Sequence, residues 1–398
     1  MLKSQGETLE RSTTMKKMEW KIPLAPIEEK SRRHKAIREQ MAIRKIDCLI
    51  IPGMHSNYGA GRANIRYVSN YAQWYDDEYI TFPLSGEPLL YAWNAAHFDW
   101  GKRVSWVSIK LSNEREYIKD MAEEIKRLGL DRKTLGIVDL RIMPTQTYLG
   151  LLKELPSATF VDASDLFLTL RLVKSPAELK FVRKAAELAD IGFNAMLETA
   201  EVGVHDREVW SACERAMTLA GAEPPSFSLY CSGPWPDKGI GFIYGPMDRR
   251  LEKGDIVFNE ITPCYGGYWI QLCRAIVLGE PSDDFKKAYD AQVEIYDLAN
   301  RELRPGNTFA ELEEKARELA KKRGYLHKIV LQHMGLQITE RIPLQTMFRP
   351  GMYFVNHPWE EYPYSSPEVG GHIIGDTVVV TDGAPERLTK LPFQLYQK

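Results

Sequence analysis

The segment 254–279, GDIVFNEITPCYGGYWIQLCRAIVLG, constrains the fold of this chain more than any other part of the sequence. Two apolar strand patterns flank YGGY at 265–268, and a glycine pair between such stretches is typical of a β-hairpin. With the turn centred near 265–266, Glu260 and Gln271 lie directly opposite each other, where Cβ atoms are ~5 Å apart. The pattern predicts a carboxylate beside an amide in an otherwise apolar strand pair. It also allows Glu260 to lie on a solvated face.

Two element patterns divide the chain into two domains. From about 29 to 168, helical patterns alternate with short strands such as CLIIPG and TLGIVD, which favours an α/β layer domain. From about 172 to 393, helices accompany strands that must pair over long sequence separations, which predicts an α+β domain. The boundary carries a capping box, Ser175 to Glu178, with proline at the first helical position. Residues 1–28 are polar without clear periodicity, and we expect a flexible or surface-draped leader.

Composition excludes several classes of protein. A net charge of -2 over 398 residues argues against nucleic-acid binding, which requires a basic excess. The apolar stretches are shorter than the ~20 residues of a membrane span, and the N-terminus lacks the apolar region of a secretion signal. The five cysteines have neither CxxC nor zinc-finger spacing, so we expect free thiols in a reducing cytoplasm. We therefore expect a cytoplasmic protein that acts on a small molecule, without a nucleic-acid or membrane partner.

Only eight histidines are present, and three of those in the same half of the chain as Glu260 lie in or beside strand patterns. His333 in VLQHMGLQI and His357 in MYFVNHP are inside apolar stretches, and His372 precedes the strand GDTVVVT. A lone histidine in such a stretch is more often a core residue than a catalytic one. Three of them near a buried glutamate favour a site, because burial raises a carboxyl pKa toward the range useful for acid–base work. The sequence contains no GxGxxG, GxSxG, HExxH or P-loop motif.

Several pieces in a fixed order give a family resemblance. They are ANIRYVSNY, RLVKSPAELKFVRKAAELA, YGP, the hairpin segment, HMGLQITE, FRPGMYFVNHP and GGHIIGDTVVVTDGAPERLT. With these pieces, residues 30–393 resemble the creatinase, aminopeptidase P and prolidase superfamily, the pita-bread proteins. The resemblance implies a creatinase-like N-terminal α/β domain over 29–168 and a pita-bread α+β catalytic domain over 172–393. It also implies a homodimer in which the neighbouring N-terminal domain completes the site.

The resemblance also shows where this chain departs from the metallopeptidases of the superfamily, which hold two metal ions with two Asp, one His and two Glu. The matching positions here are, in that order, Glu260 and Gln271, then His333 with His327 as a competing choice, then His357 and Gly375. A two-metal centre needs several carboxylates to balance four positive charges, and Glu260 is the only one retained. The resemblance therefore implies a metal-free branch, similar to creatinase and ectoine hydrolase, with no cofactor.

The resemblance, together with these residues, implies a hydrolase that cleaves a C–N bond in a small amide, amidine or cyclic amidine. Glu260 is expected to be the nucleophile or general base, and His333 and His357 are expected to transfer protons. Other residues expected to complete catalysis or bind the substrate are Tyr244, Gln271, Arg274, His372, Trp74 and Trp93. Arg274 could equally brace its strand, and the two tryptophans could equally be ordinary core or surface aromatics.

Three other functions remain open. Glu260, His333 and His357 form a two-histidine, one-carboxylate set that suits a single divalent metal ion in a hydrolase or peptidase-like enzyme. A lyase on a small organic acid or onium substrate needs only a proton-abstracting Glu or His. The fold also serves as a non-enzymatic binding module, although such a module needs no set of Glu and His residues.

Overall fold

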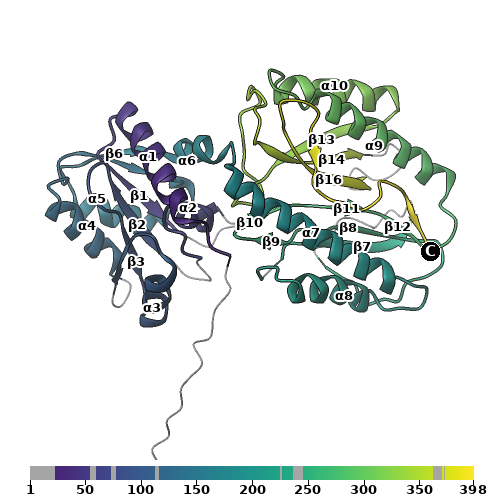
Figure 1. Ribbon diagram of the computed structural model, residues 1–398, viewed down its shortest axis with the longest axis horizontal. Coiled ribbons are helices and arrows are strands. Elements are labelled where there is room, and N and C mark those ends of the chain that lie inside the picture. The colour runs from purple at the N-terminus through teal and green to yellow at the C-terminus, as the bar shows by residue number, and fades with distance from the viewer. Residues whose placement is uncertain are drawn as a thin grey trace, which may run out of the picture.

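The computed structural model describes residues 23–53, 60–72, 78–112, 116–224, 226–235, 245–361, 370–371 and 373–398. The chain forms two domains side by side, the N-terminal one in purple and blue and the C-terminal one from teal to yellow (Figure 1). Both predicted domain types, α/β followed by α+β, are confirmed.

The N-terminal domain is a mixed six-stranded sheet flanked by helices, with strand order β4-β3-β2-β1-β5-β6. Its central strands are buried on both faces, which is why they are continuous apolar stretches in the sequence. The strands are β1 (Cys48–Pro52), β2 (Tyr79–Pro83), β3 (Leu89–Ala92), β4 (Ser108–Leu111), β5 (Thr134–Ile137) and β6 (Thr159–Asp162). The helices are α1 (Ile27–Ile43), α2 (Ala60–Ser69), α3 (Ala95–Val104), α4 (Tyr117–Arg127), η3 (Leu140–Ile142), α5 (Thr145–Glu154) and α6 (Ser164–Arg171).

The C-terminal domain contains four long helices and two main sheets, ordered β11-β16-β14-β13 and β18-β12-β8-β7. The helices are α7 (Pro176–Thr199), α8 (Asp206–Leu219), α9 (Asp283–Glu302) and α10 (Phe309–Lys322). The strands up to the hairpin are β7 (Leu229–Pro234), β8 (Asp255–Glu260), β9 (Cys264–Tyr265), β10 (Tyr268–Trp269), β11 (Cys273–Arg274) and β12 (Ile276–Val277). The later strands are β13 (Leu326–His333), β14 (Tyr353–Glu361), β15 (Gly370–Gly371), β16 (Ile374–Val379), β17 (Glu386–Arg387) and β18 (Tyr396–Gln397).

The helices cover one face of each sheet and leave the other face to the interior between the sheets. Val257 and Ile261 belong to the same core cluster as residues of α7, and Phe354 and Val378 pack with α9 and α10. Side chains alternate along a strand. The residues directly next to these positions in each strand therefore point to the opposite, inner face. Glu260 is one of these inward-facing residues, so the inner face is where a site can form.

The predicted hairpin is confirmed, but its turn lies one residue further along the chain than expected. Tyr265 pairs with Tyr268, and the turn residues Gly266 and Gly267 have φ of 62° and 82°. Two successive positive φ values explain the glycine pair, because residues with a Cβ adopt this conformation at a steric cost. The resulting register places Glu260 opposite position 273 rather than opposite Gln271.

The N-terminal domain begins before its predicted start, and the C-terminal domain ends after its predicted end. The capping box at Ser175 and Glu178 forms as predicted and starts α7. The first helix begins at Ile27, inside the predicted leader 1–28, of which residues 1–22 lie outside the described part. The C-terminal domain continues beyond the predicted end at 393, since β18 pairs with β12.

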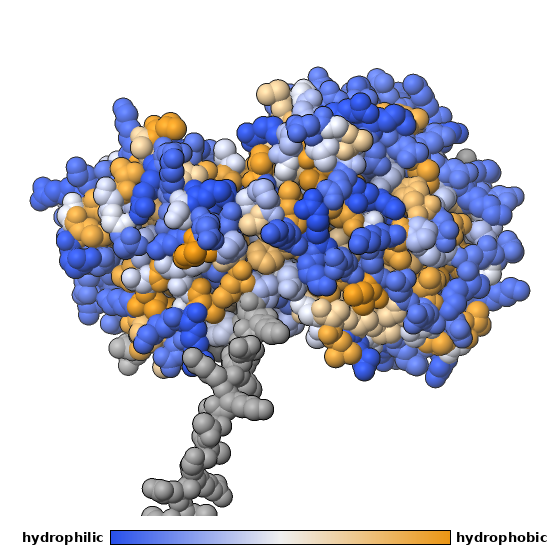
Figure 2. All heavy atoms as spheres, in the orientation of Figure 1, coloured by the Kyte–Doolittle hydropathy of each residue, from blue (hydrophilic) through white to orange (hydrophobic). Residues whose placement is uncertain are grey.

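Hydrophilic side chains predominate on the surface of both domains in the view of Figure 2, with hydrophobic ones scattered among them. Among the described residues, no helix combines the length and the apolar character that crossing a bilayer requires.

A buried ion-pair cluster around Glu178 joins the two domains. Its Oε1 accepts hydrogen bonds from Arg33 Nη2 at 3.0 Å and from Tyr268 Oη at 2.6 Å. Its Oε2 accepts from Arg32 Nη2 at 3.1 Å and from the backbone N–H of Ser175 at 2.6 Å. The carboxylate thereby fixes α1 and the β9–β10 hairpin against the start of α7. Because Arg33 is only 1% exposed, its charge depends on these partners.

We predict that Glu178→Gln lowers the free energy of unfolding by about 3–5 kcal/mol, the usual effect of removing one charge from a buried pair. Urea denaturation of the full chain measures this change. The matched control is Glu187→Gln, an exposed glutamate on the same helix, for which we expect little change. Equal stability of the two variants would contradict a structural role for the Glu178 cluster.

Candidate active site

Glu260 and Gln271 form the centre of the polar inner face. Gln271 Nε2 donates to Glu260 Oε2 at 2.6 Å and lies 3.3 Å from Thr262 Oγ1. The register places these residues diagonally, two positions apart, and not directly opposite as predicted. A shift of two positions keeps both side chains on one face, so the predicted contact forms although the predicted pairing is wrong.

The environment of Glu260 suits acid–base chemistry. The residue is 7% exposed, and burial raises the pKa of its carboxyl group to about 8, against a smaller lowering by the hydrogen bond from Gln271. Near neutral pH the group is therefore mostly protonated, with a fraction of carboxylate. A carboxyl group in this range can both donate and accept a proton during a reaction.

A cross-strand row connects Glu260 with His357. Ile261 pairs with Leu272 in the hairpin, so Glu260 lies opposite Cys273. Cys273 pairs with Gly375 in β16, and the register between β16 and β14 places Gly375 beside His357. Residues of one row share a face of the sheet, so all of these side chains point inward.

Glycine at position 375 makes room for the other side chains of this row. A Cβ on Gly375 would lie 2.6 Å from the Cβ of His357, closer than the two atoms can approach, and 3.2 Å from Sγ of Cys273, which is a tight contact. His357 and Cys273 thus crowd the space above Gly375, and Glu260 is the next side chain in the row. Burial and the neighbouring Glu260 hold the pKa of the Cys273 thiol well above its usual range, so this residue stays a neutral thiol.

His333 does not join this row, contrary to the prediction. It pairs with Phe354, whose side chain packs with α9 and α10 on the outer face. There Lys174 Nζ donates to His333 Nε2 at 3.0 Å, and Nδ1 lies 3.4 Å from Glu340. Burial and the charge of Lys174 hold the pKa of His333 well below its usual range. His333 is therefore a neutral member of a buried network and does not shuttle protons at Glu260.

The inward position on β13 belongs to Gln332, which the sequence analysis missed. Gln332 pairs with Val355, which in turn pairs with Thr377, and the Thr377 hydroxyl donates to the backbone oxygen of Gln271. The amide of Gln332 is held by the following loop, where Nε2 donates to Thr339 Oγ1 at 2.7 Å. Strand alternation was the available signal, because Gln332 and His333 must point to opposite faces.

The contacts of Arg274 correct its predicted role. Its Nη2 donates to Asp376 at 2.6 Å, and its Nη1 donates to the backbone oxygens of Cys273 and Gly375. Asp376 also accepts from Tyr296 of α9, so this ion pair lies on the outer, helix-covered face. Arg274 therefore links β11 to β16, which is the other role that its position in the sequence allowed. It does not bind substrate.

The remaining predicted residues do not enter the described site. Tyr244, His372 and Trp74 lie outside the described residues. Trp93 packs on the core of the N-terminal domain and contacts the ring of His97 edge-on. His327, the competing ligand position, contacts Glu313 of α10 at 2.8 Å. The homodimer that the resemblance implies stays a prediction.

The described residues do not fit a two-metal centre. Of the positions that resemble metal ligands, only Glu260 supplies a carboxylate, and the inner face adds amides, a thiol and His357. In the described part of the chain, no group of three His, Cys, Asp or Glu side chains lies together in a way that could hold a metal ion. The predicted single-metal set fails because His333 points to the outer face.

We predict that Gly375→Ala destabilises the protein by about 1–3 kcal/mol, because an added methyl group must displace the backbone or side chain of His357. Thermal or urea unfolding measures this change. Gly245→Ala is the matched control, since nothing lies within 4 Å of an added Cβ there and its φ is not positive. An unchanged stability for Gly375→Ala would show that β14 and β16 are less closely packed than described here.

Comparison with known proteins places both domains in one family. Residues 33–173 match the Creatinase/Prolidase N-terminal domain, and residues 180–382 match Metallopeptidase family M24. An Xaa-Pro dipeptidase from Pyrococcus horikoshii is 30% identical over 286 residues, which cover 69% of this chain and 79% of that protein. A creatinase from a Bacillus species is 28% identical over 391 residues, 92% of each protein.

The structures agree with the sequences. The crystal structure of the prolidase from Pyrococcus horikoshii matches 92% of this chain and 99% of its own, with a TM-score of 0.77 and 26% identity. The residues matched by the family model, 180–382, include Glu260, Gln271, His357 and Gly375. The chain therefore belongs to metallopeptidase family M24, with a creatinase/prolidase N-terminal domain followed by the pita-bread domain.

Proposed function

We propose that this protein is a creatinase-like hydrolase that cleaves a C–N bond in a small nitrogen-containing molecule, using protein side chains in place of two metal ions. The named relatives, Xaa-Pro dipeptidases and a creatinase, act on C–N bonds. The observation that carries the proposal is the buried Glu260, whose pKa is raised to about 8 and whose Oε2 is held by Gln271 at 2.6 Å.

Glu260 can supply both proton transfers of a hydrolysis. As a carboxylate it accepts a proton from the attacking water, and as a carboxylic acid it donates a proton to the departing nitrogen. The hydrogen bond from Gln271 orients the group without adding a charge. A pKa near the working pH keeps both protonation states accessible, which is the condition for a group that must act as base and then as acid.

His357 is the second functional group of the proposal. It is 2% exposed and shares the row of Glu260, with Cys273 and the side-chain-free Gly375 between them. An imidazole on this row can bind or protonate a substrate group opposite Glu260. Because His333 points to the outer face, the proposed catalytic pair is Glu260 and His357.

The donor set supports metal independence. Gln271 and Gly375 stand where the resemblance places metal-binding carboxylates, and neither balances the charge of a metal ion.

Turnover of a defined panel tests the proposal. We suggest creatine, an Xaa-Pro dipeptide, an N-acyl amino acid and a cyclic amidine, each with and without EDTA. We expect activity on at least one compound that survives EDTA, and a loss of at least ~100-fold in kcat for Glu260→Gln, the lower size of general acid–base contributions. Glu318→Gln, an exposed glutamate on α10, is the control and should retain wild-type activity.

Two results would contradict the proposal. A kcat for Glu260→Gln within a few-fold of wild type would remove Glu260 from the chemistry. Activity that EDTA abolishes and that stoichiometric Mn²⁺ or Zn²⁺ restores would exclude metal independence.

The pH dependence of stability tests the protonation of Glu260 without a substrate. Its pKa is about 8 in the folded protein and near the ordinary 4.5 when unfolded, so the folded state binds the proton more tightly. This contribution to stability is fully present below about 4.5 and is lost as the pH rises through about 8. Glu260→Gln lacks this loss, so we expect the free energy of unfolding of the variant to increase relative to wild type over this range. A constant difference across the range would show that the Glu260 pKa is not raised.

A further inference from the structure

A cavity of about 430 Å³ lies on the helix-covered, outer face of the C-terminal domain. The walls of this outer cavity come from the end of α9, the turn between β16 and β17, and the segment that precedes β18. Val378 of β16 lines it and packs with α9 and α10, and Arg387 of β17 pairs directly with Val378. Because side chains alternate along β16, Gly375 points to the opposite face. The outer cavity is therefore separate from the inner face that carries Glu260.

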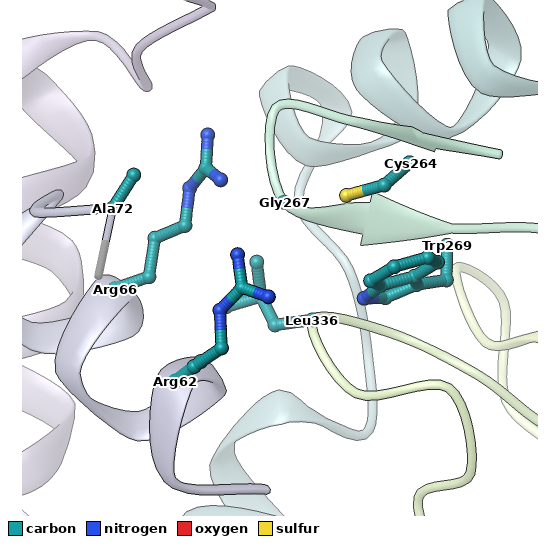
Figure 3. A pocket seen from close by; sticks show the side chains of 7 residues that line it. All are labelled: Arg62, Arg66, Ala72, Cys264, Gly267, Trp269 and Leu336. Atoms are coloured by element: carbon teal, nitrogen blue, oxygen red, sulfur yellow. The ribbon is translucent and has the colours of Figure 1, made fainter. Parts of the chain in front are cut away.

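The size of the outer cavity suits a small organic molecule, since ligand pockets in proteins usually measure about 300–1,000 Å³. The pocket at the domain junction in Figure 3 differs, although it also contains arginines. It measures about 20 Å³, which leaves room for little more than one water molecule. Its Arg66 is already paired with Glu223 at 2.6 Å. The outer cavity therefore offers space for a ligand that the junction does not.

Three arginines line the outer cavity, two of them at the end of α9 and one on β17. Arg301 lies in the last turn of α9, and Arg304 follows shortly after the helix. Both are exposed, and in the part of the chain that the structure describes their side chains form no hydrogen bond or ion pair. Their charges are thus available to a ligand that enters from solvent.

The third arginine, Arg387, is held in place and still has donors for a ligand. Its Nη1 donates to the backbone oxygen of Leu391 at 3.1 Å and lies 3.8 Å from Asp376. Asp376 already accepts hydrogen bonds from three other side chains, those of Arg274, Tyr296 and Thr389. A guanidinium group has several N–H donors, and the described contacts leave most of those of Arg387 unused.

Positive charge exceeds negative charge in the lining of the outer cavity. Three arginines stand against one acidic residue, Asp297, which leaves an excess of two positive charges. The neighbouring carboxylates are paired with cations outside the lining, in the pairs Glu302–Lys315, Glu386–Arg183 and Asp376–Arg274. The partial negative charge at the C-terminal end of α9, about half a unit, offsets only part of the excess. The outer cavity therefore favours an anion.

A phosphate monoester matches both the charge and the lining of the outer cavity. It carries about −1.5 to −2 charges near neutral pH, close to the excess of positive charge. Arginine forks bind phosphate oxygens through paired hydrogen bonds, which makes arginine well suited to this group. The rings of Tyr296 and Phe393, whose centroids are 4.5 Å apart, supply an apolar part of the lining for the organic portion of such a molecule.

We propose that the outer cavity binds a small organic phosphate monoester, with its phosphate at the three arginines and its organic portion against Phe393. The site is separate from catalysis, because the sheet lies between it and Glu260, so this proposal does not depend on the proposed function. The alternative is that the three arginines are solvated surface charges, which would bind all anions weakly and without preference.

Calorimetric titration of the full chain at constant ionic strength tests the proposal without turnover. The probes are AMP and ribose 5-phosphate as phosphate monoesters, adenosine as a nucleoside without phosphate, and inorganic phosphate. We expect both monoesters to bind wild type and adenosine not to bind. Inorganic phosphate should bind at least ~10-fold more weakly than the tighter monoester, because it lacks the apolar contacts.

The variant Arg301→Gln/Arg304→Gln removes two charges that have no partner in the described part of the chain, so it should fold as wild type. We expect it to bind the monoesters at least ~10-fold more weakly, because charge-assisted hydrogen bonds are lost. The matched control, Arg132→Gln/Arg349→Gln, makes the same change in net charge at exposed positions outside the cavity and should bind as wild type. Asp297→Asn should bind more tightly, because it removes a repulsive charge.

An absence of monoester binding by wild type would overturn the proposal. Equal monoester affinity of wild type and Arg301→Gln/Arg304→Gln would do the same, as would an equal loss of affinity in the control variant. Inorganic phosphate that binds as tightly as the monoesters would overturn the assignment to an organic ligand. Adenosine that binds as tightly as AMP would overturn the role of the arginines. Glu260→Gln should leave monoester binding unchanged, which keeps this test distinct from that of the proposed function.

Discussion

The inner face of the C-terminal sheets depends on one constraint, the antiparallel alignment of β8 with residues 272–277, and of β11 with β16 and β14 in the neighbouring sheet. The hairpin aligns β8 with the segment that contains β11 and β12. Of these two strands, β12 pairs with β8 and β11 pairs with β16, both in antiparallel orientation. Because side chains alternate with a period of two, this register decides for every residue whether it points to the helices or to the interior. Glu260, Gln271, Cys273 and His357 are inward by this rule although they come from distant parts of the sequence.

The same rule separates two kinds of buried polar group. On the outer face, Arg274 is neutralised by Asp376, and burial together with the charge of Lys174 keeps His333 neutral by lowering its pKa. These groups are held by charged partners and strengthen the attachment of strands to helices and to the domain boundary. On the inner face, Glu260 has an amide as its recorded partner and a raised pKa. Chemistry is therefore possible on the inner face, whereas the outer polar groups have structural roles.

Much of the fold could be predicted from local sequence signals, because these signals act over a few residues. The capping box at Ser175, the glycine pair of the hairpin and the two-domain pattern all form as expected. The choice of His333 over Gln332 failed for a non-local reason. The bulges in β13 between 327 and 331 change its register against β14, and a strand's own sequence does not reveal which of two neighbouring polar residues points inward.

On the inner face, the residues that stand in place of the carboxylates depend on one another sterically. His357 occupies the space above position 375, so glycine there is required once a histidine stands at 357. With Gln271 and Gly375 uncharged, the single remaining carboxylate is stable in a buried site only if a proton or a cation neutralises it, and burial raises its pKa toward the protonated form. Neutral Glu260 adds no charge to the inner face. An uncharged C–N group of a substrate can therefore approach a protonated Glu260 without electrostatic penalty.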